Sequence, residues 1–446
     1  MSTRDTIHDR LCEIKVIDTH EHLWDESYRL EHPGDWTGLF FQYGITALQM
    51  AGMTLSETDE LYAETTPYAR KWAIFSRYFP LARNTAYLRS VLIAIRDLYG
   101  IEQITSETMQ ELSTRIKSAV KPGFQRWVLA EKAGIDYALV NCFDRDAAGD
   151  RYPARTWGDT ALLHPVLYAD ELIHPAGYAL LSRLTGVDTA SFDGWLAAID
   201  AYFAQVAEQC LAVKIALGYG RELYFDAGVS RAEAERLYIR HRATPLSYAA
   251  ARPMGDYIFH HVLRRAADYR LPLQFHTGIY SGANYMNAYR LRDNVRDLAL
   301  LAIAHPECRF IVMHIAYPFQ NELVLAARQI TNLYAEMSWA WIVDPDASAH
   351  FLAQMLEAAP LNKLLGFGGD YALVENAYGH LQLARQAVAH VLASMVAERG
   401  WDLDQACEAG WYLLHGAAAR LLGEPPAVWR EDMAYCAGET GAGHVS

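Results

Sequence analysis

Residues 16–24 read Val-Ile-Asp-Thr-His-Glu-His-Leu-Trp. The run from Ile14 to Ile17 is short, mostly apolar and rich in β-branched residues, which predicts a buried strand. His20 and His22 follow it, and because side chains at i and i+2 of an extended segment point to the same side, their imidazoles converge. One metal ion could bind both rings there. A pair of this kind also arises for structural reasons or by chance, so the assignment depends on partners elsewhere in the chain.

The composition describes an ordinary globular protein. The chain has 446 residues, of which 52% are hydrophobic and 21% charged, enough for one large α/β barrel with an insertion or for two domains. A formal net charge of −14 without a basic block argues against a nucleic-acid partner. Met1–Arg10 is polar and no apolar run approaches the ~20 residues of a membrane span, so we expect no signal peptide and no membrane partner.

The cysteines favour a reducing compartment. None of them forms a Cys-x-x-Cys pair, and in a chain of this length scattered cysteines indicate reduced thiols and a cytoplasmic location. They are Cys12, Cys142, Cys210, Cys308, Cys407 and Cys436.

The chain is predicted to fall into four parts. Residues 1–24 hold the first barrel strand, and 25–124 show helical spacing without repeated strand signals. Because this is far longer than a barrel connection needs, we interpret 25–124 as a helical insertion over the barrel mouth. Residues 125–424 form the remainder of the barrel, and the glycine-rich residues 425–446 a loosely held extension.

Short apolar runs alternate with helical patterns along the rest of the chain, which predicts a parallel sheet. With the first strand they number eight, so the predicted fold class is α/β, a (β/α)8 TIM barrel with its active site at the C-terminal ends of the strands. The later runs are 136–143, 164–170, 210–217, 271–276, 309–314, 333–339 and 363–370.

Metal-binding side chains end several of these runs. Lys214 lies on the fourth, His276 ends the fifth, His314 ends the sixth and Asp370 ends the eighth. Imidazole and carboxylate ligands suit a divalent metal, most readily zinc, while manganese, nickel and iron stay open. We therefore predict a metal site of one or two ions.

Lys214 has three interpretations. Within Ala-Val-Lys-Ile-Ala it can reach solvent or neutralise a carboxylate. Burial lowers the pKa of a lysine, and the free amine can then take up carbon dioxide and become a carboxylated ligand bridging two metals. A plain ammonium that binds an anionic substrate is the third.

These motifs resemble the amidohydrolase superfamily. The resemblance rests on Asp-Thr-His-Glu-His-Leu, the Val-Lys of the fourth strand, Gln-Phe-His-Thr-Gly, Val-Met-His-Ile-Ala-Tyr-Pro-Phe and Gly-Gly-Asp, and it covers nearly the whole chain. The second half is similar to amidohydrolase-related barrel domains fused to glutamine-synthetase-like proteins, and the helical insertion is similar to that of uronate isomerases. The resemblance implies that the strand-end histidines are metal ligands and that Asp370 binds metal and moves a proton.

The expected activity is metal-dependent hydrolysis of an amide, a lactone or a similar carbonyl compound. A metal lowers the pKa of its bound water toward ~7 and polarises the carbonyl oxygen. Asp370 and His314 are the catalytic candidates, Asp370 as the group that takes and returns the proton. Candidate substrate contacts follow strands four to six: Tyr219, Arg221, Tyr280 and Tyr317. Arg221 suits a carboxylate or phosphate, but it can equally form a surface ion pair with Glu222 or Asp226.

Three other functions stay open: a uronate-type aldose–ketose isomerase, a metal-dependent decarboxylase, and a metal-bound barrel used as a binding module. Where uronate isomerases are expected to hold their sugar acid with arginines, this chain has Ala372 and Tyr280, and it adds His314 on strand six. These departures favour hydrolysis over isomerisation. A small-molecule substrate is the expected partner, and a homo-oligomer is left open.

Overall fold

A computed structural model of the chain describes residues 2–141, 143–145, 151–153, 159, 161–284 and 288–423. Its contacts divide it into two compact units. Unit 1 comprises Met1–Ala138, Tyr280–Met286 and Glu336–Ser446, and unit 2 comprises Leu139–Ile279 and Asn287–Ala335. The predicted extension 425–446 lies outside the described residues.

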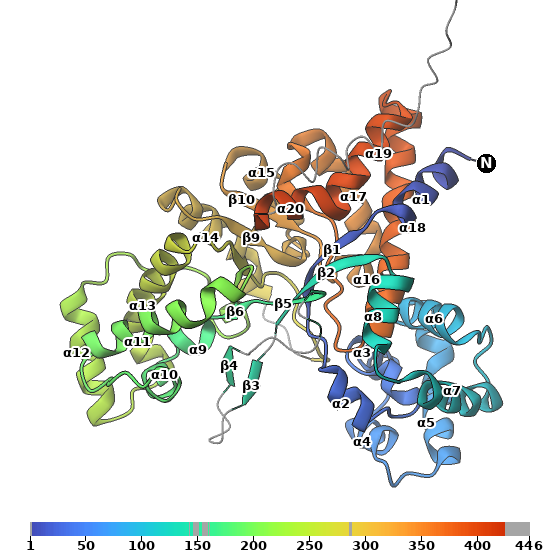
Figure 1. Ribbon diagram of the computed structural model, residues 1–446, viewed down its shortest axis with the longest axis horizontal. Helices are drawn as coiled ribbons and strands as arrows, with labels where there is room; N and C mark the ends of the chain where they lie inside the picture. Colours follow the sequence, from blue (N-terminus) through green and yellow to red (C-terminus); the bar gives the residue numbers. More distant parts are fainter. Residues whose placement is uncertain are drawn as a thin grey trace, which may run out of the picture. The chain divides into compact units, whose positions relative to one another are not determined.

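Strand β1 (Val16–Glu21) lies at the centre of unit 1, with all its residues buried. It is paired with β2 (Ile135–Val140), as Figure 1 shows. Its other side is bound to the segment after β11 (Leu364–Leu365), where the Thr19 amide donates to the Phe367 carbonyl at 3.2 Å. A strand buried on both faces and both edges can present side chains only where it ends, at His20 and His22.

The segment between β1 and β2 is helical wherever it has regular structure. Thr54, Thr85 and Thr105 cap three of its helices through their side chains. The helical spacing over 54–79 divides into two helices, because Pro67 disfavours helical geometry at the residue before it. The elements are α2 (Glu26–Glu31), η1 (Trp36–Phe40), α3 (Tyr43–Met50), α4 (Leu55–Tyr62), α5 (Tyr68–Ala82), α6 (Ala86–Tyr99), α7 (Ser106–Ala119), α8 (Phe124–Arg126) and η2 (Trp127–Lys132). A separate insertion domain over 25–124 stays a prediction.

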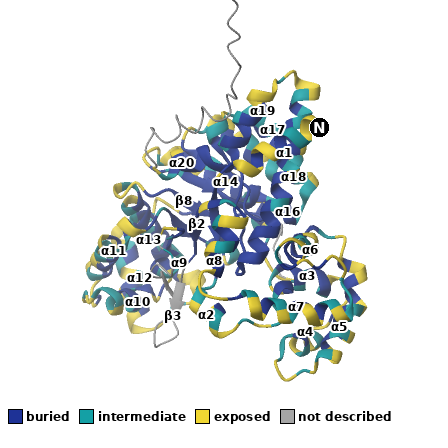
Figure 2. Cartoon of the chain, turned by 45° about the vertical axis from the view of Figure 1, so that its right-hand side comes forward, coloured by how far each residue is buried: buried dark blue, intermediate teal, exposed yellow. Residues whose placement is uncertain are grey.

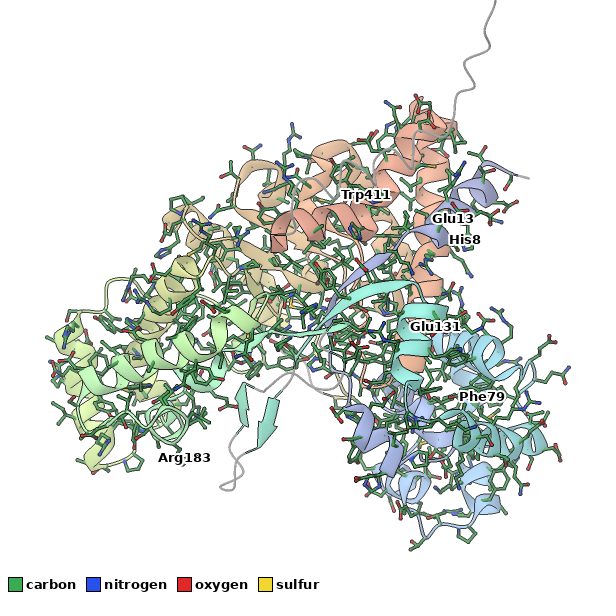
Figure 3. All side chains as sticks on the ribbon, viewed as in Figure 1. His8, Glu13, Phe79, Glu131, Arg183 and Trp411 are labelled. Atoms are coloured by element: carbon green, nitrogen blue, oxygen red, sulfur yellow. The ribbon has the colours of Figure 1, made fainter. Side chains whose placement is uncertain are left out.

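Helix α18 (Val374–Arg399) is the longest element of unit 1 and lies beside α1 (Thr3–Glu13) and α6, as Figure 1 shows. Close approach depends on Gly379, where an added Cβ would lie 2.0 Å from the carbonyl oxygen of Ser90 on α6. Trp411, labelled in Figure 3, ends α19 (Leu403–Trp411), and its ring fills the space beside Gly416. The remaining elements are α16 (Ala340–Val343), α17 (Pro345–Ala358), η6 (Leu361–Lys363), η7 (Tyr412–Gly416) and α20 (Ala417–Leu422).

Unit 2 is built on parallel strands in the order β6 (Leu167–Tyr168), β7 (Val213–Ile215), β8 (Leu273–Phe275), β9 (Phe310–Val312) and β10 (Leu333–Glu336). Lys214 on β7 pairs with Tyr168 on β6 and Gln274 on β8. The carboxyl ends of these strands therefore lie at one edge. Figure 2 shows the strands dark blue and yellow patches along α10 and α12, as expected for strands covered by amphipathic helices.

The helices of unit 2 alternate with its strands as predicted, and residues 244–247 separate two of these helices. They are α9 (Asp170–Ile173), α10 (Gly177–Thr185), α11 (Phe192–Val206), η3 (Ala207–Gln209), η4 (Leu217–Tyr219), α12 (Arg231–Ala243), α13 (Tyr248–Asp268), α14 (Ala288–Ala304), η5 (Met313–Ala316) and α15 (Gln320–Gln329). Three short strands lie outside the parallel set: β5 (Leu163–Pro165) and the antiparallel pair β3 (Phe143–Arg145) and β4 (Arg151–Pro153). No helix among the described residues is long and apolar enough to cross a membrane.

Gly379→Ala tests the packing of α18 on α6. Alanine favours a helix over glycine by about 1 kcal/mol, so an unpacked helix would gain stability. Here the added methyl meets backbone, and we expect a net loss of about 1–3 kcal/mol in the free energy of unfolding, measured by denaturant titration. Gly38→Ala is the control, since its Cβ meets nothing within 4 Å. Equal effects of the two changes would contradict the packing argument.

Candidate metal centre

Two imidazoles and one carboxylate of unit 1 converge at the end of β1. His20 Nε2 lies 3.2 Å and His22 Nε2 3.3 Å from Asp370 Oδ1, and the three ligand atoms all lie within 4.8 Å of one another. His20 and Asp370 are buried, whereas the His22 side chain is 35% exposed. Two neutral imidazoles and a carboxylate form a donor set that suits a divalent metal. The convergence of His20, His22 and Asp370 predicted from the sequence is therefore present.

The backbone places Asp370 against β1. Its φ is +60°, a left-handed conformation that aspartate tolerates better than most residues. Its amide donates to the His20 carbonyl at 2.8 Å, and the His22 amide donates to the Tyr371 carbonyl at 3.1 Å. Main-chain bonds thus join the ligand-bearing segments directly, and they set the distance between the histidines and the carboxylate.

Two buried carboxyl groups of β1 hold the same loop. Asp18 Oδ1 accepts from the amides of His20 and Gly369, each at 3.1 Å, and Glu21 Oε2 accepts from the Tyr371 amide at 2.7 Å. Burial raises the pKa of Asp18 to about 6, and burial with the nearby Asp18 charge raises the pKa of Glu21 well above its usual range. An added Cβ at position 369 would lie 1.9 Å from Glu21 Oε1, so any other residue there would displace the Glu21 carboxyl group.

Gln42 binds the loop from the start of α3. Its Nε2 donates to the Asp370 carbonyl at 3.1 Å, and its Oε1 accepts from the Ala372 amide at 2.9 Å. Its own φ is +70°, unusual for a residue with a side chain. The side-chain amide of Gln42 thus forms hydrogen bonds with the backbone on both sides of Tyr371.

His380 completes the support and was not singled out from the sequence. It is fully buried on α18, and its Nδ1 lies 2.9 Å from the Gly369 carbonyl. Burial lowers the pKa of His380 to about 4, which keeps the ring neutral. Sequence reasoning missed His380 and Gln42 because neither ends a strand.

The other predicted ligands gather in unit 2. His314 Nε2 lies 3.0 Å from His276 Nδ1, and Lys214 Nζ lies 2.7 Å from Met313 Sδ. His314 sits in η5 with φ at +56°, so the chain turns sharply directly after β9. The Tyr219 and His276 ring centroids are 4.2 Å apart. Metal-ligand roles for Lys214, His276 and His314 stay predictions, as does carboxylation of Lys214.

Asp170 joins this group and was also missed. It follows β6, where its side chain accepts from the Ala216 amide at 2.9 Å and the Tyr168 hydroxyl at 3.2 Å. Burial raises the pKa of Asp170 to about 7, with the Lys214 charge opposing that shift. The strand-end rule would have found it, since Asp170 ends the predicted run 164–170.

The predicted substrate contacts are buried or half-buried. The Arg221 guanidinium is buried and forms an ion pair with the Asp256 carboxylate at 2.7 Å, in place of the expected pair with the Glu222 or Asp226 carboxylate. Its Nε also donates to the backbone carbonyl of Glu222 at 3.1 Å. Tyr280 is buried in unit 1, and Tyr317 is half-buried in unit 2. Their contact with substrate stays a prediction, as does that of Tyr219.

Known proteins resemble this chain along most of its length. A family model described as amidohydrolase matches residues 17–423. Uronate isomerase from Rhizorhabdus wittichii is 23% identical over 422 residues, 89% of this chain and 90% of that protein. Protein fluG of Emericella nidulans is 25% identical over 259 residues, 54% of this chain but only 29% of fluG. The crystal structure of glucuronate isomerase from Caulobacter crescentus has a TM-score of 0.74 at 18% identity and covers 95% of both chains.

The comparisons confirm one expectation and correct another. The predicted (β/α)8 barrel class is confirmed, because the solved structure matches nearly the whole chain. The expected hydrolase activity is wrong, because the relatives matched along most of both lengths are uronate isomerases. The departures at Ala372 and Tyr280 weigh less than a likeness to uronate isomerases over 89% of this chain.

Removing the two imidazoles tests the metal centre. His20→Ala/His22→Ala should lose most of the bound metal while the fold persists, since only one of three converging ligands remains; elemental analysis of the purified protein measures it. The control is His350→Ala/His390→Ala, which removes two exposed helical histidines. Full metal content in the first variant would exclude this centre.

Gln42→Leu tests the support of Asp370. It removes both hydrogen bonds to the loop, and loss of groups that orient ligands typically weakens metal binding about 10–100-fold. Chelator competition measures the affinity. Gln49→Leu is the control, since the side-chain amide that it removes donates to the Thr58 hydroxyl, at 3.2 Å, and not to the loop that carries Asp370. Unchanged affinity in Gln42→Leu would show that β1 alone fixes the carboxylate.

Proposed function

The chain belongs to the amidohydrolase family, and within it we propose that this protein is a metal-dependent aldose–ketose isomerase of the uronate type. The observation that carries the proposal is the His20–His22–Asp370 centre in a chain that matches uronate isomerases along most of both lengths. A small sugar acid is the proposed substrate.

An aldose–ketose isomerisation moves one proton from C2 to C1 and another from the C2 oxygen to the C1 oxygen. No atom enters or leaves, so one group that alternates as base and acid can serve both halves. We assign that exchange to Asp370, whose carboxylate lies beside both imidazoles. The buried surroundings and the fixed loop hold this carboxylate in one orientation, which positioned proton transfer requires.

His20, His22 and Asp370 would hold the metal, for which we propose zinc. When bound, a divalent metal supplies a positive charge that stabilises the developing negative charge on the sugar's C1 and C2 oxygens. Neutral imidazoles are needed for this, and the backbone bonds around His20 and His22 hold both rings beside the carboxylate. Half-exposed His22 is the member of the centre that a ligand in solution can reach.

Ala372 and Tyr280 affect how tightly the carboxylate of the substrate is bound. Where a uronate's carboxylate would meet an arginine, this chain offers no cation at either position. Hydrogen bonds to charged groups contribute about 1.5–3 kcal/mol each, so their loss weakens binding of the carboxylate rather than the chemistry. We therefore expect a raised KM on common uronates with a substantial kcat.

The activity is tested by incubating metal-loaded protein with D-glucuronate and D-galacturonate and following formation of the ketose. A kcat/KM of about 10⁴ M⁻¹s⁻¹ on one sugar acid would match natural substrates. Asp370→Asn keeps the shape but removes the base, and kcat should fall at least ~100-fold.

His350→Ala is the control, because this exposed histidine lies on α17 away from the centre. Absence of ketose from a panel of sugar acids, with full metal content, would reject the proposal. Near-normal kcat in Asp370→Asn would place the base elsewhere.

A further inference from the structure

A further buried carboxyl group lies beside β1. It belongs to Glu336, the last residue of β10, which falls in unit 1 and is fully buried. A buried carboxylate costs free energy unless hydrogen bonds compensate it. The hydrogen-bond partners of Glu336 therefore indicate which parts of the structure depend on this side chain.

The Glu336 carboxylate joins β1 to the turn that follows β10. Its Oε1 accepts from the Thr19 hydroxyl at 2.7 Å and from the Ser338 amide at 2.8 Å. Its Oε2 accepts from the Ser338 hydroxyl at 2.5 Å. Thr19 and Ser338 are buried as well, so these hydrogen bonds are shielded from water.

The loop that carries Asp370 reaches the same carboxylate. The Thr19 hydroxyl also lies 2.8 Å from the carbonyl oxygen of Phe367. Gly368 approaches so closely that an added Cβ would lie 2.9 Å from Glu336 Oε1. Three segments of unit 1 therefore meet at Glu336, and we call the meeting point, formed by Thr19, Glu336, Ser338 and Gly368, the Glu336 cluster.

The Glu336 cluster is close in sequence to two of the three converging ligands. Thr19 directly precedes His20, and Gly368 lies two residues before Asp370. Because side chains alternate along a strand, Thr19 points to the face of β1 opposite His20. Glu336 thus holds the strand from the side that the imidazoles do not occupy, and its effect on them passes through the backbone.

We propose that Glu336 is a positioning residue of the metal centre, which sets the distance between His20 and Asp370 by joining β1 to the loop. The inference rests on the metal centre and not on the proposed isomerisation, because it concerns the folded chain before any substrate binds. Positioning requires the acceptor oxygens of Glu336 and not its negative charge. A glutamine of the same length keeps one acceptor oxygen, and the Ser338 hydroxyl can rotate to accept from its amide group.

Glu336→Met and Glu336→Gln test the proposal on the full chain. Methionine has a similar length but removes the acceptors of Thr19 and Ser338. Its Zn²⁺ affinity, measured by chelator competition, should fall about 10–100-fold, the usual effect of losing a group that orients metal ligands. Glutamine should keep the native affinity. The visible absorption spectrum of the Co²⁺-loaded protein, which reports the geometry of the ligands, should change with methionine and not with glutamine.

A second measurement needs no metal. Hydrogen–deuterium exchange of the metal-free protein, followed by mass spectrometry, should be faster over residues 367–371 in Glu336→Met and native in Glu336→Gln. Gly368→Ala perturbs the Glu336 cluster from the loop, since its methyl would lie 2.5 Å from Ser338 Cβ, and it should lower Zn²⁺ affinity as Glu336→Met does.

Leu112→Ala is the control for lost stability. Leu112 is fully buried on α7, which contributes no residue to the Glu336 cluster. This variant should unfold at a lower temperature and yet keep the native Zn²⁺ affinity, Co²⁺ spectrum and exchange over 367–371. His20→Ala/His22→Ala shows independently whether the measured Zn²⁺ is bound at this centre.

Three results would overturn the proposal. The first is native Zn²⁺ affinity in both Glu336→Met and Gly368→Ala. The second is an equal loss in Glu336→Gln and Glu336→Met, which would assign the effect to the charge. The third is a loss in Leu112→Ala as large as in Glu336→Met, which would reduce Glu336 to general stability. If Glu336→Met fails to fold, as judged by thermal unfolding, Thr19→Val and Gly368→Ala decide.

Discussion

The left-handed backbone at Asp370 is the constraint on which the candidate centre depends. A residue with φ at +60° keeps that conformation only when its surroundings fix it. Here the amide of Asp370 binds the His20 carbonyl, its carbonyl binds Gln42, and the next amide binds Glu21. The main chain therefore places Asp370 beside the histidines, and from there its carboxylate reaches both imidazoles.

This arrangement makes β1 unusual. Asp18 and Glu21 are both fully buried, and a buried carboxyl group costs free energy unless it is hydrogen-bonded. Their partners are the backbone amides of the loop that carries Asp370. The cost of burying these carboxyls is offset only while the loop is in place, so the strand and the loop order each other.

The sequence predicted the features that periodicity and chain order indicate, namely strands, helices and the residues that follow the strands. His20, His22 and Asp370 were predicted because each follows a short apolar run, and such a run followed by a possible metal ligand can be recognised in the sequence alone. Gln42 and His380 could not be found in this way, since each contacts the loop through a side chain that belongs to a helix and not to the end of a strand. The wrong prediction of hydrolysis has a similar origin. The residue type at a single position such as Ala372 does not show which residues surround it in the folded protein.

The helices between β1 and β2 do more than cover the strand. Glu375, in the first turn of α18, accepts from Arg29 of α2 and from the Tyr99 hydroxyl of α6, each at 2.9 Å. Gln42 reaches the same region from α3. The loop that presents Asp370 is thus fixed on one side by β1 and on the other by three of these helices. A change inside the helical segment, for example at Arg29, can therefore alter the metal centre without touching any of its ligands.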